Sequence, residues 1–193
     1  MKKTEFKKGF TLVEMLVTLS IIVFMSGLLI AYTRNGEKLG QLNRGNERLN
    51  FDVRRMASMS MQTKQVKDKE GELRDVCGWG IYFNTEKNNT YTIFSDYCLS
   101  DPADPEGIRV VDMGNRLYDE GEEQETIKLG QNVSIITDMD GGIGSFVYAP
   151  PQPQLYIFDR DETKISEGKI ILNVGGNNQK EITLTESGNF IIK

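Results

Sequence analysis

The chain begins with one long apolar segment and continues as many short alternating ones. Phe10–Ala31 is 22 residues long, and Glu14 is the one ionisable residue within it. At a helical rise of about 1.5 Å per residue this segment would extend roughly 33 Å, which is enough to cross a hydrocarbon core of about 30 Å. The pattern therefore predicts a membrane-spanning helix, to which we assign residues 10–33.

A helical pattern continues beyond the apolar segment, over residues 34–62. The apolar positions that recur at helical spacing are Leu39, Leu42, Leu49, Val53 and Met56. Such a stripe is typical of a helix with one buried face. We therefore predict an amphipathic continuation of the first helix, with Met56, Met59 and Met61 packed under a sheet.

From residue 76 the apolar pattern changes to a period of two. Gly78–Phe83 and Thr90–Phe94 flank a polar turn and predict a hairpin. Further short strands are predicted at Ile108–Asp112, Thr126–Leu129, Val133–Thr137, Ser145–Tyr148, Leu155–Phe158, Lys169–Val174, Glu181–Thr185 and Asn189–Ile192. Residues 63–75 are rich in charge and predict a solvated connector. A long helix followed by strands alone predicts an α+β fold with an antiparallel β-rich head over residues 76–193.

Charge is distributed unevenly along the chain. The formal net charge is −5, whereas residues 1–9 carry +3 and residues 76–193 carry −10. Because positive segments stay on the cytoplasmic side, the N-terminus is predicted inside and the head outside. An acidic head repels phosphate backbones, which disfavours nucleic-acid binding. The sequence has no His, so the commonest general base and metal ligand is missing, and we expect neither an enzyme nor a cofactor.

The start of the apolar segment reads Lys7-Lys8-Gly9-Phe10-Thr11-Leu12-Val13-Glu14. This stretch resembles the processing site of type IV prepilins and type II secretion pseudopilins. The resemblance implies that residues 1–9 are a leader removed after Gly9 by a prepilin peptidase and that Phe10 is N-methylated. It also implies that Glu14 meets the N-terminal amine of a neighbouring subunit during assembly and sets the register. The alternative for Glu14 is an interfacial carboxylate that stays hydrated.

Two further stretches resemble the general secretion pathway H and FimT group of minor pseudopilins. They are Gly78-Trp79-Gly80-Ile81 and the C-terminal strands from Lys169 to Ile192. The resemblance implies a single-pass protein of the cytoplasmic (inner) membrane with a periplasmic or extracellular head, which later enters a pilus or pseudopilus. Its implied partners are other pilins or pseudopilins, an assembly ATPase and an inner-membrane platform protein.

Three other functions stay open at this point. A major pilin would share every feature so far described. A DNA-binding minor pilin of a DNA-uptake system would need exposed Arg and Lys side chains on the head, and these are sparse there. An enzyme or receptor with an uncleaved signal anchor would keep its N-terminus.

Two smaller constellations are candidates for sites. Cys77 and Cys98 bracket the predicted hairpin, and they are either a disulfide that would stabilise the fold by roughly 3 kcal/mol or two free thiols. Asp138 and Asp140 begin a calcium-loop spacing, but the later Glu of such a loop is replaced by other residues, so a turn between strands is the preferred interpretation and no metal site is assigned. The acidic stretches 101–107 and 119–123 are interpreted as solvated loops or as contacts for a basic partner.

Overall fold

The computed structural model describes residues 10–62, 65–84, 86–98, 114–137, 139, 141–150, 154–175 and 178–192. The chain divides into two compact units, residues 1–38 and 39–193. Helix α1, Leu12–Ser60, contributes to both units. Each unit is described separately below.

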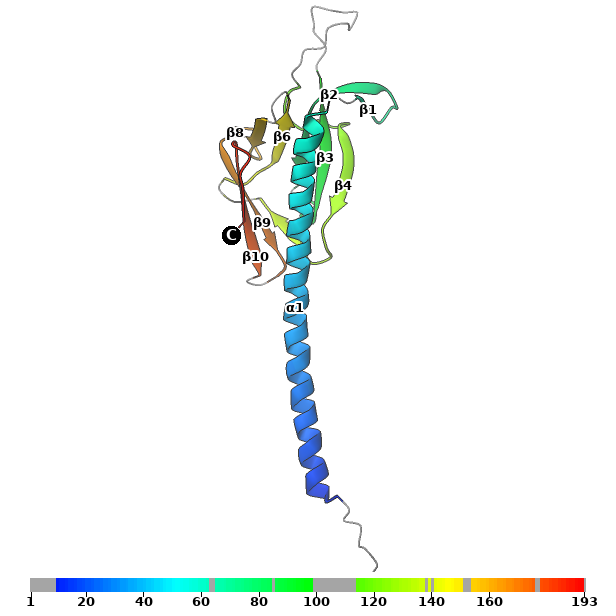
Figure 1. Ribbon diagram of the computed structural model, residues 1–193, viewed down its shortest axis with the longest axis vertical. Coiled ribbons are helices and arrows are strands. Elements are labelled where there is room, and N and C mark those ends of the chain that lie inside the picture. Colours follow the sequence, from blue (N-terminus) through cyan, green and yellow to red (C-terminus); the bar gives the residue numbers. More distant parts are fainter. Residues whose placement is uncertain are drawn as a thin grey trace, which may run out of the picture. The chain divides into compact units, whose positions relative to one another are not determined.

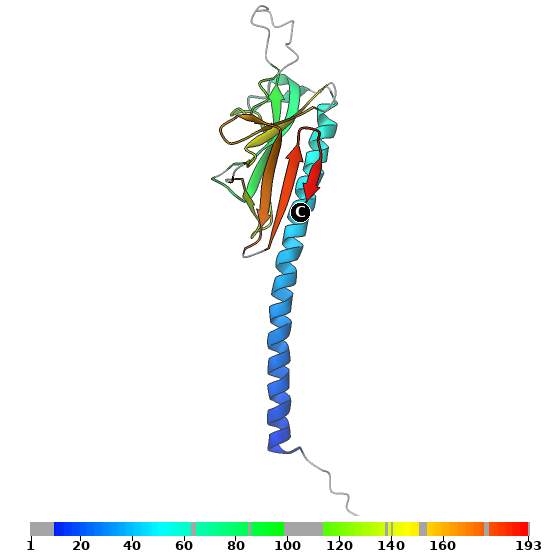
Figure 2. The same ribbon diagram turned by 90° about the vertical axis from the view of Figure 1, so that its left-hand side faces the viewer.

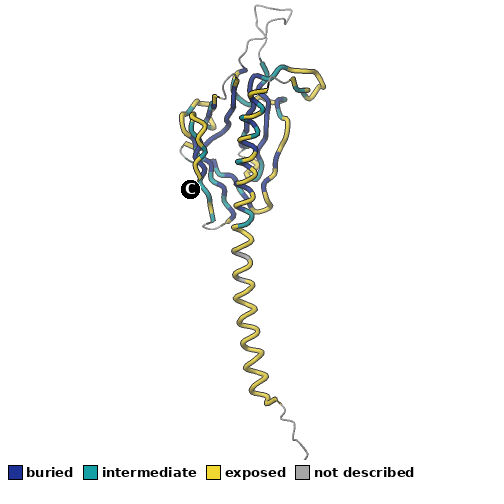
Figure 3. The backbone as a smooth tube through the Cα atoms, viewed as in Figure 1, coloured by how far each residue is buried: buried dark blue, intermediate teal, exposed yellow. Residues whose placement is uncertain are grey.

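In the first unit, the Leu12–Ile30 part of helix α1 is predominantly apolar on every side. Leu12–Ile30 has a mean hydropathy of 2.3 over 19 residues, and none of it is buried within the protein. The described side chains from Phe10 to Leu39 are all exposed, as the yellow trace in Figure 3 shows. A helix that is hydrophobic all round needs an apolar surrounding other than water. Its length and composition are sufficient for a membrane span.

The second unit contains two antiparallel sheets and the C-terminal half of α1 (Figures 1 and 2). The larger sheet has the order β4-β3-β2-β6-β7-β8, with β1 paired to β2, and the smaller has the order β11-β10-β9-β5. The strands of the larger sheet are β1 (Gln65–Lys67), β2 (Leu73–Tyr82), β3 (Thr90–Tyr97), β4 (Glu123–Lys128), β6 (Ser145–Ala149), β7 (Gln154–Phe158) and β8 (Lys164–Ile165). Those of the smaller are β5 (Ser134–Ile136), β9 (Glu167–Asn173), β10 (Gln179–Thr185) and β11 (Phe190–Ile192). The predicted α+β class is confirmed.

One hydrophobic core joins the helix to both sheets. Its helical members are Leu42, Leu49, Val53 and Met56, each at most 4% exposed. They meet inward side chains of β2, β3 and β6 from the larger sheet and of β9 and β10 from the smaller sheet. The predicted stripe is therefore the packed face, except that Leu39 is 50% exposed because it stands at the edge of this unit. Met59 is partly buried against the core, but Met61 lies beyond the helix end and is 59% exposed, so the prediction for Met61 is wrong.

The predicted strands were found with small shifts, and two strands were not anticipated. β1 and the first residues of β2 form a hairpin inside the stretch interpreted as a connector. Its side chains are mostly exposed, so the apolar alternation on which strand prediction depends is missing there. β8 has only two residues, too few to show a period. The strand predicted at Ile108–Asp112 lies outside the described residues.

Candidate functional site

The N-terminus of α1 is closed by a reciprocal pair of side chains. Thr11 precedes the first helical residue, and its backbone N–H and its hydroxyl both donate to Glu14 Oε2 at 2.9 Å. The Glu14 N–H lies 3.3 Å from the Thr11 hydroxyl, which accepts from it. This is a capping box, which satisfies backbone donors that a helix otherwise leaves open. Glu14 is therefore already hydrogen-bonded within its own chain.

Where the helix meets the larger sheet, a buried carboxylate holds the two together. Asp52 is fully buried, and its Oδ2 accepts hydrogen bonds from Tyr91 Oη of β3 at 2.5 Å and from Arg48 Nε at 3.0 Å. Arg55 Nη1 lies 4.0 Å from the other oxygen. Burial, followed by the hydrogen bond to Asp52, raises the pKa of Tyr91 well above its usual value, so this hydroxyl stays a donor. We call this group the helix clamp (Arg48, Asp52, Tyr91).

The opposite face of the larger sheet is covered by residues 114–122, which we call the strap. The ring of Tyr118 stacks on Tyr82 at 4.2 Å and meets Phe94 edge-on at 5.4 Å. Arg116 Nη1 donates to the Cys77 carbonyl at 2.6 Å and lies 3.3 Å from Asp96 Oδ2. Phe94 and Asp96 are fully buried beneath it. The strap therefore closes a second, smaller layer of packing.

Two carboxyl groups buried near the strap have raised pKa values. Burial raises the pKa of Asp96 to about 6, although Arg116 opposes the shift. Burial raises the pKa of Glu122 to about 7, although its carboxylate accepts the amides of Tyr97 at 2.8 Å and Asp119 at 3.1 Å. Burial disfavours a charged carboxylate more than these partners favour it. Glu122, in a stretch interpreted as a solvated loop, is in fact only 5% exposed, so that interpretation is wrong for this residue.

Cys77 of β2 and Cys98, which follows β3, are joined by a disulfide. Their backbones are also close, because Cys98 N–H donates to the Asp75 carbonyl at 2.9 Å. The bond ties the middle of β2 to the residue that directly follows β3. Such a crosslink forms in oxidising compartments.

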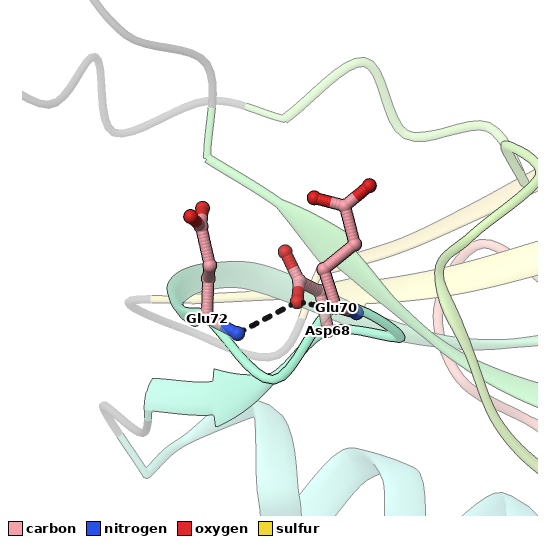
Figure 4. Close-up of side chains that lie close together, drawn as sticks. All are labelled: Asp68, Glu70 and Glu72. Atoms are coloured by element: carbon pink, nitrogen blue, oxygen red, sulfur yellow. Dashed lines mark hydrogen bonds between the residues drawn. The ribbon is translucent and has the colours of Figure 1, made fainter.

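Among the described residues, one group of carboxylates is close enough to suggest a cation site. Asp68, Glu70 and Glu72 lie in the β1–β2 hairpin with oxygens within 4.8 Å of one another (Figure 4). Asp68, however, accepts the backbone amides of both other residues and pairs with Arg74 Nε at 3.0 Å. The three carboxylates are therefore close together because Asp68 stabilises a tight turn, and no cation is needed to explain their positions.

Of the remaining predicted site residues, Phe10 alone lies within the described part of the chain. Gly9 lies outside the described residues, and so do Asp138 and Asp140, the calcium candidates. Phe10 is described, directly before the capping box, and is 79% exposed.

The helix clamp and the strap were missed from the sequence. The i, i+4 spacing of Arg48 and Asp52 was a signal for an ion pair, and Thr11-x-x-Glu14 was a signal for the capping box. No local pattern marks Asp96 or Arg116, because their partners are distant in the sequence.

Comparison with known proteins identifies the N-terminal segment. Residues 6–30 match the family described as the prokaryotic N-terminal methylation motif. Searches of curated proteins and of solved structures gave no match.

The chain thus has the N-terminus of a type IV pilin-like prepilin, and the predicted resemblance to type IV pilins and pseudopilins is confirmed there. This motif indicates processing by a prepilin peptidase and assembly with other pilins. It points to a structural subunit rather than an enzyme, and the apolar helix beside it fits a single-pass anchor.

Proposed function

We propose that this chain is a minor pilin or pseudopilin of the general secretion pathway H and FimT type. It would be cut between Gly9 and Phe10, N-methylated on Phe10 and assembled into a type II secretion pseudopilus or a type IV pilus. The observation that carries the proposal is the methylation motif over residues 6–30, followed directly by an exposed apolar helix. A soluble domain has no use for such a helix, whereas a filament subunit buries it in lipid and then against other subunits.

The capping box defines what Glu14 does in this scheme. Within the described residues, both Thr11 donors go to Oε2 of Glu14, and none goes to Oε1. Cleavage after Gly9 would leave Phe10 as the one residue ahead of the cap, carrying a new amine. A neighbouring amine could then donate to Oε1 without dismantling the cap. A paired carboxylate is tolerated in an apolar helix bundle, while an unpaired one is penalised by several kcal/mol, roughly 2.5–3.5 on insertion scales.

The proposal also defines location and partners. The subunit would wait in the cytoplasmic membrane with its N-terminus inside and its disulfide-bonded head outside. A platform protein and an assembly ATPase would then move it into the filament. Exchanging lipid for protein around the Leu12–Ile30 helix costs little, because both surroundings are apolar.

The N-terminus of the mature protein tests the proposal. The full chain would be produced in cells with a prepilin peptidase, beside a Gly9→Val variant, and both would be analysed by intact mass and terminal sequencing. We expect the parent to begin at N-methyl-Phe10 and the variant to keep Met1. If Met1 persists in both, the chain is an ordinary signal-anchored protein and the proposal fails.

A further inference from the structure

The second unit carries a basic pocket on one side of α1. The pocket is lined by Gln41, Arg44, Gly45, Arg48, Lys128, Leu129, Gly130 and Gln131, and it encloses about 350 Å³. Three cations line it and no carboxylate does, in a head whose net charge is strongly negative. Arg48 belongs to the helix clamp. Among the described residues, Arg44 and Lys128 have no ion-pair partner, so the pocket has two uncommitted positive charges.

Beside this pocket, α1 presents an exposed aromatic side chain. Phe51 is 60% exposed, and the Arg48 guanidinium lies 6.0 Å from the centre of its ring. Arg44, Arg48 and Phe51 are spaced by four and three residues, so they lie on one face of the helix. Aromatic and Arg side chains that are exposed together are the residue types that dominate protein interfaces.

The same unit also carries a pocket of opposite charge. It is lined by Asp68, Lys69, Glu70, Arg74, Tyr97, Cys98, Asn115, Asp119, Glu120, Gly121 and Glu122, with a volume of about 540 Å³. Five carboxyl groups and two cations line it. Glu70 and Glu120 make no side-chain ion pair within 4.0 Å in the described part of the chain, although Glu70 acts electrostatically on Arg74 and Glu120 on Lys69.

The two pockets lie at opposite ends of strand β4. The acidic pocket includes Glu122, directly before the strand begins, and the basic pocket includes Lys128, at its end. Figure 1 shows β4 running from the β1–β2 end of the head toward the opposite end. Six residues of strand extend about 20 Å. One copy therefore cannot bring its own two pockets together.

We propose that the basic pocket, with Phe51 beside it, binds the acidic pocket of a second copy of this chain. This inference rests on the proposed function, because it names the surface by which one head meets the next. The contact joins two different patches and is therefore heterologous. A heterologous contact that does not close into a ring lets two copies lie next to each other along a filament without ending it.

Site-directed crosslinking of the full chain in membranes of cells with an assembly system tests the contact. One tagged copy carries Gln131→Cys in the basic pocket, and a differently tagged copy carries Leu73→Cys in the hairpin that borders the acidic pocket. Leu73 is 61% exposed, and Gln131 is also exposed. We expect a disulfide-linked heterodimer on a non-reducing gel. As controls, two copies that both carry Gln131→Cys, or two copies that both carry Leu73→Cys, should give little disulfide-linked dimer.

Charge-reversal variants test whether electrostatic attraction between the two pockets stabilises the contact. Arg44→Glu in the first copy, or Glu70→Arg with Glu120→Arg in the second, should each lower the heterodimer yield about fivefold or more. Combining the two reversals should restore the yield to within about twofold, because attraction is re-established with opposite sign. Arg160→Glu, an exposed reversal in the turn after β7, is the matched control and should leave the yield unchanged.

Several results would overturn this inference. An absent heterodimer, a yield that Arg44→Glu does not change, or reversals that fail to compensate would each do so. If Arg44→Glu leaves crosslinking intact and instead weakens binding of duplex DNA to the full-length protein, the pocket serves nucleic acid. N-terminal cleavage, read by mass on the same samples, separates the two proposals. Cleaved chains without charge-dependent crosslinking leave the proposed function standing and remove this inference alone.

Discussion

The helix clamp is the part of this structure whose energetic value can be worked out most directly. Tyr91→Phe removes one hydroxyl and changes nothing else in the shape of the core. Tyr91 is fully buried, and its hydroxyl donates to the equally buried carboxylate of Asp52. The variant therefore leaves a buried anion with one donor fewer, while the ring still fills its place.

Two estimates bracket the expected loss of stability. A hydrogen bond to a charged group contributes about 1.5–3 kcal/mol. Removing a whole partner from a buried ion pair costs about 3–5 kcal/mol, but Arg48 and Arg55 remain beside Asp52 in this variant. We therefore expect Tyr91→Phe to lower the free energy of unfolding of the head by about 2 kcal/mol.

Urea unfolding followed by tryptophan fluorescence measures this quantity. Trp79 is the protein's single tryptophan, and it is 4% exposed in the core next to α1, so its emission reports the head alone. The matched control is Tyr156→Phe, whose hydroxyl bonds Gln154 on an exposed surface and should cost under about 0.5 kcal/mol. Equal losses in the two variants would refute the idea that the buried hydrogen bond stabilises the helix on the sheet.

Three further predictions use the same fluorescence assay. Asp96 and Glu122 hold their protons more tightly in the folded head, with pKa values of about 6 and about 7 against 3.8 and 4.5. Their contribution to stability should therefore be full below about pH 4 and fall as pH rises to about 7. Glu122→Gln should flatten that fall, and an unchanged profile would contradict it. Reducing Cys77–Cys98 should cost about 3 kcal/mol, with a Cys77→Ser/Cys98→Ser variant insensitive to reductant. Gly80→Ala should cost about 2 kcal/mol or more, because its Cβ would lie 2.7 Å from the Phe94 ring, and a neutral result would contradict this packing.

The elements that were predictable are those whose burial follows a period. The stripe Leu42, Leu49, Val53 and Met56 was found because a helix against a sheet buries every third or fourth residue. Strands such as β9, whose residues alternate between buried and half-exposed, were found for the corresponding reason. The charge-rich β1–β2 hairpin has no such period, so its sequence predicts a connector rather than two strands.

The acidic stretch after residue 118 shows that a charged residue type does not by itself indicate an exposed side chain. Glu122 is buried, and its carboxylate accepts hydrogen bonds from two backbone amides. No local sequence pattern indicates these two hydrogen bonds. Arg116, at φ 66°, reaches back to the Cys77 carbonyl, 39 residues earlier. Contacts of this kind depend on how the strap crosses the sheet, which is a property of the tertiary fold.

Glu14 brings the local and the assembled levels together. From the sequence alone, Glu14 is a carboxylate inside an apolar helix, which costs free energy on membrane insertion. The structure shows a use for it in the single chain, because it caps the helix through Thr11. The cap fixes the helix start at Leu12, two residues after the proposed cleavage point. In the proposed filament, the amine of Phe10 would therefore sit at a defined height relative to the Glu14 of its own chain. A fixed spacing between donor and acceptor lets one carboxylate per subunit set axial register, which a flexible terminus could not do.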